Sequence, residues 1–368
     1  MGRGGMPRAT SSTSRVCQID RDSEGPVDNY ALLMKEYGKP EDVLWMEKQA
    51  KPGIEMLRDD QVLIRILAAP INPSDISLIE GRYPLRADHL PCTPGFEGVG
   101  VVEAVGKNVT RLRPGDRAVP IEHGQGTWRT YGVFEQNHWY RIPHDLPIST
   151  AATMCINPPT ALRLLEEFVD LEEGDSIIHT GGTSSTGRYI LQLAKQRGIR
   201  CISVIRDRPE RKETELELKE LGASLVVTSE ELVDAMKEWP HARPKLGLDC
   251  IGGEASLQVA KVLAPNATLV VYGGMSRQPI QIPPGSFIFQ NITVKGFWLT
   301  GGYAQMKHGW KAKELLVDRV IALFRQKVIK PVTVDCLPFD QWKKGIDVYR
   351  KSNTTKMLLT HYTDDVCM

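Results

Sequence analysis

The chain has 368 residues, enough for two domains that each bury their own hydrophobic core. Charged residues make up 25% of it, but the formal net charge is only +1, which argues against a partner held by bulk electrostatic attraction, such as nucleic acid or an anionic membrane. No apolar run approaches the roughly 20 residues of a membrane span, and the seven cysteines are scattered without a C-x-x-C pair, as in proteins with reduced thiols.

The N-terminal segment, residues 1–27, differs from the rest. Arg3, Arg8 and Arg15 stand among serines and threonines, and no acidic residue precedes Asp20. This composition is typical of a transit peptide, although an apolar helical face is not evident, and a disordered tail explains it as well. We expect a location in the mitochondrial matrix in the first case and in the cytoplasm in the second.

Residues 28–155 have the pattern of a β domain. Short apolar stretches separated by glycine and proline turns predict strands over 61–69, 98–105, 115–121, 130–134 and 138–142. Irregular spacing of this kind favours a small β-barrel.

From residue 156 onward, strands and helices alternate, which predicts a parallel sheet covered on both faces. Its first unit is a strand over 176–179, a glycine-rich loop over 181–187, a helix that ends at Gly198 and a strand over 201–205. A glycine-rich turn before a helix N-terminus suits a pyrophosphate, because free backbone N–H groups and the helix dipole point at it. The G-x-G-x-x-G pattern is absent and Ser185 replaces the middle glycine, so a plain strand-to-helix turn remains an alternative.

The residues that follow the second strand indicate which cofactor would bind. NAD-binding units tend to place an acidic residue there, whereas a 2′-phosphate requires cations. Here Arg206 and Arg208 flank Asp207, and a guanidinium offers a bidentate fork to phosphate. We therefore predict NADPH rather than NADH; the alternative is a solvated helix start of mixed charge.

The rest of the sheet and the C-terminal segment follow in order. Strands are predicted over 224–228, 245–250, 267–272 and 292–297, and helices over 213–221, 230–238 and 254–263. Residues 301–368 add helices over 312–326 and 340–350 and strands over 332–339 and 356–361. We expect this segment to return to the first domain, so that the nucleotide domain, 156–300, is inserted within it. The apolar stretch 292–299 could pair across a homodimer as an edge strand.

Several short motifs, spread over almost the whole chain from about residue 28, resemble one known family. They are NPSD at 72–75, EGRY at 80–83, PGFEG at 94–98, GTWRT at 126–130, NPPTA at 157–161, RDRP at 206–209, YGGM at 272–275 and KGFWL at 295–299. Together they resemble the mitochondrial trans-2-enoyl-thioester reductases, a zinc-free branch of the medium-chain dehydrogenase/reductase superfamily.

That resemblance implies an α/β fold in which a GroES-like β-barrel catalytic domain carries an inserted Rossmann domain with a doubly wound parallel sheet. It implies NADPH-dependent reduction of an enoyl thioester on acyl carrier protein or CoA, with Tyr83 as the proton donor and a homodimer as the assembly. The residues that it places at the NADPH site are Asn157, Thr183, Ser184, Ser185, Thr186, Arg206, Asp207, Arg208, Tyr272, Gly273, Gly274, Met275, Phe297, Trp298, Leu299, Thr300 and Lys356.

Two departures from the patterns of relatives bear on the chemistry. Phe96 stands where zinc-dependent alcohol dehydrogenases carry a histidine beside Glu97, and the sequence has no cysteine cluster. We therefore expect no metal. Glu97 is interpreted as a structural acid near the cleft. The phosphate loop has S-S-T-G at 184–187 where such reductases usually have S-G-V-G. A quinone or alkenal reductase, and a non-enzymatic NADPH-binding paralogue, therefore remain open alternatives.

Overall fold

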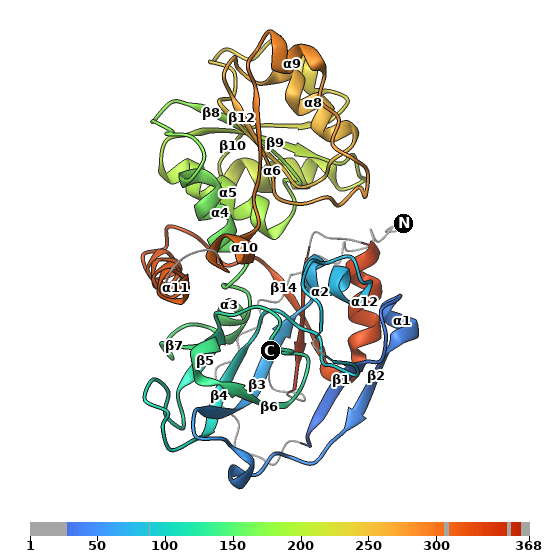
Figure 1. The fold of residues 1–368 in the computed structure, drawn as a ribbon. Helices are drawn as coiled ribbons and strands as arrows, with labels where there is room; N and C mark the ends of the chain where they lie inside the picture. Colours follow the sequence, from blue (N-terminus) through green and yellow to red (C-terminus); the bar gives the residue numbers. More distant parts are fainter. Residues whose placement is uncertain (1–27, 88, 305–308, 352–354, 362–368) are drawn as a thin grey trace, which may run out of the picture.

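The computed structural model describes residues 28–87, 89–304, 309–351 and 355–361, which form two bodies, each built on one main sheet (Figure 1). The lower body in that view carries the seven-stranded sheet and the upper body the six-stranded one. None of the helices in these residues is both long and apolar enough to cross a membrane.

The seven-stranded sheet is assembled from both ends of the chain. Its strands run in the order β14-β15-β3-β4-β5-β7, and β6 pairs with β3. The strands are β3 (Gln61–Pro70), β4 (Val99–Val105), β5 (Arg117–Pro120), β6 (Tyr131–Glu135), β7 (Trp139–Ile142), β14 (Val334–Pro338) and β15 (Lys356–Thr360). β3 is buried over nearly its whole length, which explains its continuous apolar sequence. β15, near the C-terminal end of the described residues, pairs antiparallel with β3.

The six-stranded sheet is entirely parallel, with the order β10-β9-β8-β11-β12-β13. Its strands are β8 (Ser176–Thr180), β9 (Arg200–Ile205), β10 (Ala223–Thr228), β11 (Leu246–Asp249), β12 (Thr268–Val271) and β13 (Thr293–Gly296). The order reverses between β8 and β11, and open sheets of this kind bind ligands at the carboxyl ends of the strands at that point.

The helices that belong to the six-stranded sheet lie along both of its faces and at the junction of the two bodies (Figure 1). They are α4 (Asn157–Glu166), α5 (Ser185–Gln196), α6 (Arg211–Leu221), α7 (Leu232–Ala235), α8 (Glu254–Val262), α9 (Pro284–Ile288), α10 (Leu299–Ala304) and α11 (Gly309–Arg325). The prediction of a helix over 230–238 is wrong in length: the predicted helix is too long, because the regular hydrogen bonding of α7 covers only four residues.

The prediction that residues 28–155 are mostly β omitted several elements. An antiparallel hairpin, β1 (Tyr30–Met34) and β2 (Leu44–Lys48), precedes the sheet, and the short helix α1 (Pro40–Val43) connects its strands. Helices α2 (Pro73–Ile79) and α3 (Ile148–Ala152) also fall in this range, and α12 (Trp342–Lys351) packs against β15. α2 matters most for function, because Tyr83 follows its C-terminus.

The two bodies share a hydrophobic core. One cluster of buried residues joins Leu67 and Val99 of the seven-stranded sheet to Ile177 of β8 and Leu191 of α5, with Val320 of α11 in the same cluster. A shared core fixes the two bodies relative to each other.

Candidate active site

The glycine-rich loop after β8 is shaped by contacts that only glycine allows. Gly181 has φ +67°, and a Cβ on Gly187 would lie 2.6 Å from the carbonyl oxygen of Gly181 and 2.8 Å from that of Gly182. Ser184 caps α5, since its Oγ accepts a hydrogen bond from the Gly187 N–H at 3.1 Å. The loop therefore presents the N-terminus of a twelve-residue helix at the carboxyl edge of the sheet.

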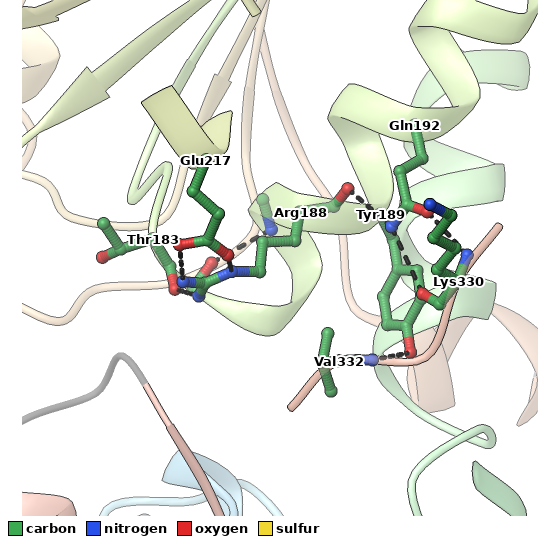
Figure 2. A network of polar contacts seen from close by, with 9 residues as sticks. Thr183, Arg188, Tyr189, Gln192, Glu217, Lys330 and Val332 are labelled. Atoms are coloured by element: carbon green, nitrogen blue, oxygen red, sulfur yellow. Dashed lines mark hydrogen bonds and ion pairs between the residues drawn. The ribbon is translucent and has the colours of Figure 1, made fainter. Parts of the chain in front are cut away.

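Figure 2 shows how α5 is held in place. Arg188 donates to both carboxylate oxygens of Glu217, at 2.7 and 2.9 Å, and also to the carbonyl oxygen of Thr183 in the loop. One turn along the helix, Gln192 Oε1 accepts from the Lys330 N–H at 2.6 Å. These contacts tie the phosphate loop to its own helix and α5 to the segment that leads to β14.

Ser185 and Thr186, the two departures in the loop, occupy the first positions of α5. The Thr186 hydroxyl donates to Asn157 Oδ1 at 3.0 Å, and this bond links the starts of α5 and α4. Asn157 Nδ2 is buried and has no hydrogen-bond partner among the described residues. A buried amide donor without a partner is costly, so a ligand oxygen here would satisfy it.

The arginines after β9 place positive charge at the carboxyl edge of the six-stranded sheet. Burial lowers the pKa of Arg206, and the positive charge of Arg208 lowers it further. Asp207 is exposed and its carboxylate lies 3.8 Å from Arg211, which also pairs with Glu215 and Glu231. Because the nearby carboxylates are drawn to Arg211, a phosphate group would complement the Arg206–Arg208 pair.

The segment after β12 lies at the same edge. A Cβ on Gly273 would lie 3.0 Å from the Cys250 carbonyl oxygen, whereas a Cβ on Gly274 would meet no atom within 4 Å. Tyr272 is partly buried and Met275 is 42% exposed. The backbone at Gly274 is therefore open to a ligand.

The four residues that follow β13 have two kinds of surroundings. The Phe297 ring packs on the Arg163 guanidinium, 5.0 Å from ring centroid to Cζ, and the Leu299 carbonyl oxygen accepts from Arg163 at 3.3 Å. Trp298 is exposed and Thr300 is buried. Of these four predicted contact residues, the structure brings Trp298 and Thr300 to Tyr83.

Tyr83 contacts two aromatic rings, one from each body. Its ring centroid is 5.0 Å from that of Phe96 and 6.0 Å from that of Trp298, and Trp298 Nε1 donates to the Tyr83 hydroxyl at 2.8 Å. Burial raises the pKa of Tyr83, opposed by hydrogen bonds to Trp298 and Thr300. The phenol therefore keeps its proton at neutral pH and can act as an acid.

A buried polar network joins Lys356 to the residues that precede α4. Lys356 Nζ donates to Asn72 Oδ1, Asn72 Nδ2 donates to Glu97 Oε2 at 3.1 Å, and Glu97 Oε1 accepts from the N–H groups of Cys155 and Ile156 at 2.8 and 2.9 Å. Glu97 thereby connects Lys356 to the residues that precede α4, where Asn157 stands.

Three buried charges share this network. Burial raises the pKa of Asp75 to about 7, although its carboxylate accepts from the N–H groups of Asn72 and Phe96 at 2.7 and 2.8 Å. Burial also raises the pKa of Glu97, and it lowers that of Lys356 against the attraction of both acids. The Lys356 ammonium is thus held by the attraction of the two acids as well as by its hydrogen bond to Asn72.

Comparisons with known proteins identify the fold and the family. A family model described as "Alcohol dehydrogenase GroES-like domain" matches residues 58–144, and one described as "Zinc-binding dehydrogenase" matches residues 186–314. The chain is 40% identical over 322 residues to the mitochondrial enoyl-acyl-carrier-protein reductase of Arabidopsis thaliana, covering 86% of this chain and 84% of that protein. The chain belongs to the mitochondrial enoyl-acyl-carrier-protein reductase family.

Other relatives agree with this assignment. The enoyl-acyl-carrier-protein reductase of Rattus norvegicus is 37% identical and covers 96% of this chain and 92% of its own length. A solved structure of Etr1p with NADP and crotonyl-CoA superimposes with a TM-score of 0.84 at 31% identity, covering 91% of this chain and all of that one. The predicted superfamily and fold class are confirmed.

Three residues that contact the predicted site residues were missed by the sequence analysis. Asn72, His123 and Arg188 received no role there, yet each makes a polar contact with a predicted site residue. Among the described residues, no group of three or more His, Cys, Asp or Glu side chains is arranged to hold a metal ion.

Proposed function

We propose that this protein catalyses the NADPH-dependent reduction of trans-2-enoyl thioesters to saturated acyl thioesters in mitochondrial fatty acid synthesis. One observation carries the proposal: Tyr83, a phenol whose pKa burial raises, lies where the two bodies meet and accepts a hydrogen bond from Trp298. Relatives that cover most of the chain carry this activity in their names.

The described residues fit NADPH. The helix α5 N-terminus and its tight loop suit the pyrophosphate, and Arg206 and Arg208 suit the 2′-phosphate. The unpartnered Asn157 amide and the open backbone at Gly274 offer further contacts. When bound, NADPH supplies a hydride.

The protein's own groups supply the rest of the reaction. Hydride addition at Cβ leaves an enolate on the thioester, and the Tyr83 hydroxyl can give its proton to Cα. Trp298 Nε1 donates to the same oxygen and so stabilises the phenolate that remains. Lys356, held by Asn72, which in turn donates to Glu97, keeps a buried cation beside these groups.

Turnover of the full chain tests the proposal. NADPH oxidation is followed with crotonyl-CoA, with a longer trans-2-enoyl-CoA, with the same acyl groups on acyl carrier protein, and with a quinone. Saturated thioester products with little quinone turnover are expected. Quinone reduction without enoyl reduction would instead favour the quinone reductase alternative, whereas no turnover with any substrate would favour the non-enzymatic one.

A homodimer is part of the proposal. β13 is an edge strand of its sheet, and the three residues Phe287, Ile288 and Phe289 just before it are 47%, 70% and 85% exposed. A solved relative is an Etr1p/Etr2p heterodimer. Sedimentation should give twice the chain mass, and Ile288→Glu with Phe289→Glu should give a monomer.

Location in the mitochondrion is proposed from the relatives, which are named as mitochondrial proteins. The segment 1–27 that the sequence analysis interprets as a transit peptide or tail lies outside the described residues. Fusing residues 1–27 to a fluorescent protein tests it: the fusion should be imported into mitochondria, and diffuse fluorescence would contradict a targeting role.

A further inference from the structure

Asp75 is a fully buried carboxylate that takes no direct part in the proposed reaction. It stands at the third position of α2, and its two oxygens hold different parts of the chain. Oδ2 accepts from the Asn72 N–H at 2.7 Å, and Oδ1 accepts from the Phe96 N–H at 2.8 Å. The first bond caps α2, whereas the second ties α2 to the segment that precedes β4.

Tyr83 is attached to the same two parts of the chain. Its N–H donates to the carbonyl oxygen of Ser77 in α2 at 3.1 Å. Its ring packs on the Phe96 ring, with the centroids 5.0 Å apart and the ring planes inclined by 52°. The backbone of Tyr83 is therefore placed by α2, and its ring is placed by Phe96.

These contacts form a closed loop. Asp75 binds the Phe96 N–H, the Phe96 ring contacts Tyr83, Tyr83 binds Ser77, and Ser77 and Asp75 belong to the same helix. If the bond from the Phe96 N–H to Asp75 weakens, the Phe96 ring can move relative to α2, and the Tyr83 ring loses its support. A catalytic group must be held within roughly 0.5 Å of its productive position, so a movement of this kind is enough to slow proton transfer.

The strength of the two N–H bonds depends on the charge of the carboxyl group. Hydrogen bonds to an ionised carboxylate are about twice as strong as those between neutral groups. Protonation also converts one of the two oxygens to a hydroxyl, which is a poorer acceptor for the N–H that faces it. The ionised form of Asp75 therefore holds Phe96 most firmly.

The groups that face Asp75 place its change of charge near neutral pH. Burial raises the pKa of Asp75 to about 7, assisted by the Glu97 carboxylate and opposed by the two N–H bonds and the Lys356 ammonium. The charge of Asp75 also acts on Tyr83 and Tyr349, and burial raises the pKa of both phenols, that of Tyr349 to about 12. Both phenols are thus neutral near pH 7, and the charged neighbours of Asp75 are Glu97 and Lys356.

We propose that Asp75 is a positioning residue for the reaction: its ionised carboxylate holds Phe96 against Tyr83 and so fixes the Tyr83 hydroxyl for proton transfer. Asp75 acts only through Phe96 and α2, and this role rests on the proposed enoyl reductase function. Turnover then depends on the charge of a buried residue that exchanges no proton with the substrate.

Asp75→Asn in the full chain tests this role directly. The asparagine has the same size, but it offers one acceptor oxygen in place of two and turns an NH₂ group toward the other N–H donor. Because a misplacement of about 1 Å can lower a rate by about 10²-fold, kcat for crotonyl-CoA should fall by roughly 10- to 100-fold. The KM for crotonyl-CoA and the NADPH dissociation constant should stay nearly unchanged. A kcat close to the wild-type value would overturn the proposal.

Asp116→Asn is the matched control. Oδ2 of Asp116 accepts from the N–H of Arg113, three residues earlier, at 2.8 Å, which is the same local bond that Asp75 makes with Asn72. Asp116 belongs to the turn before β5, and this turn carries none of the proposed site residues. The control should keep the wild-type kcat. If both substitutions lower kcat equally, the loss reflects general destabilisation and Asp75 has no specific role.

The pH profile separates positioning from a purely structural role. In wild type, kcat should fall as pH drops through about 7, because the protonated form of Asp75 predominates below that pH. An asparagine does not titrate, so Asp75→Asn should lose this limb and remain slow on both sides of it. A limb that persists in Asp75→Asn would belong to Glu97 or Lys356 and would overturn the proposal, as would a wild-type kcat that stays constant across pH 7.

Phe96→Leu serves if Asp75→Asn does not fold. It keeps Asp75 and both N–H bonds but shortens the side chain that contacts Tyr83, so kcat should fall and its dependence on pH near 7 should weaken. Wild-type kcat and an unchanged pH profile in Phe96→Leu would show that the ring contact carries no positioning effect.

Failure of this inference can be told from failure of the proposed function. If wild type does not reduce crotonyl-CoA, the proposed function is at fault, and the crystal structure of Asp75→Asn still tests the positioning. The rings of Phe96 and Tyr83 should shift in it, and the bond from Trp298 Nε1 to the Tyr83 oxygen, 2.8 Å long in the unmutated protein, should lengthen. Unchanged positions of both rings would contradict the role of Asp75.

Discussion

Removal of the Tyr83 hydroxyl should lower the reaction rate and change the stability of the fold very little. Tyr83→Phe keeps the ring that packs on Phe96 at 5.0 Å and on Trp298 at 6.0 Å, and it deletes one hydrogen bond from Trp298 Nε1. Because the Trp298 side chain is 39% exposed, water can take its N–H. The free energy of unfolding should therefore change by no more than about 1 kcal/mol.

The effect on turnover should be much larger. Loss of a general acid costs ~10²–10⁴-fold in rate, equivalent to about 3–5 kcal/mol of transition-state stabilisation. Steady-state kinetics with crotonyl-CoA should show this loss in kcat, and fluorescence titration should give an unchanged NADPH dissociation constant. If the Tyr83→Phe variant turns over crotonyl-CoA at nearly the wild-type rate, Tyr83 is not the acid, whatever the effect of the substitution on stability.

Three further predictions concern the cofactor, acid stability and metal. Arg206→Ala with Arg208→Ala should narrow the preference for NADPH over NADH, by roughly 1.5–3 kcal/mol per charge-assisted contact; equal affinities in the unmutated protein would contradict a 2′-phosphate site. His179 on β8 is fully buried, and burial lowers its pKa from 6.5 to about 4. The unfolded chain then binds a proton that the folded one does not, so stability should fall as pH drops from 6.5 to 4, and His179→Leu should reduce that slope in denaturant titrations. Prolonged chelator treatment should leave activity unchanged, and elemental analysis that finds one zinc per chain would overturn the metal-free prediction.

Much of the fold follows from local sequence. Alternating apolar residues and glycine or proline turns placed most strands of both sheets within two residues, because such signals act over a few neighbours. Helix α2 was missed although Asn72 and Pro73 form a start signal, a capping residue followed by proline at the first helical position. Hairpin β1–β2 lacks such a signal and is held by distant backbone partners, the carbonyl oxygens of Trp128 and Cys92.

The site is less accessible to sequence reasoning than the fold. The glycine loop and the arginines after β9 are local motifs and could be found directly. The Lys356–Asn72–Glu97 network joins residues separated by up to 284 positions, and the His123–Thr300 bond spans 177. The network forms when β15 joins the sheet of the first body, and the His123–Thr300 bond forms when the two bodies pack together. No spacing rule along the chain predicts either contact.

The pairing of β15 with β3 has a consequence for synthesis on the ribosome. Thr360, Leu359 and Leu358 pair with Ala68, Ala69 and Pro70, so this end of β3 has no partner on that edge until β15 has been translated, whereas β6 can cover residues 61–65 earlier. The six-stranded sheet, whose strands all lie between Ser176 and Gly296, can form earlier. The half of the molecule that carries Tyr83 is therefore the last to become native, and an unpaired strand edge exposed for that long is a natural binding site for chaperones.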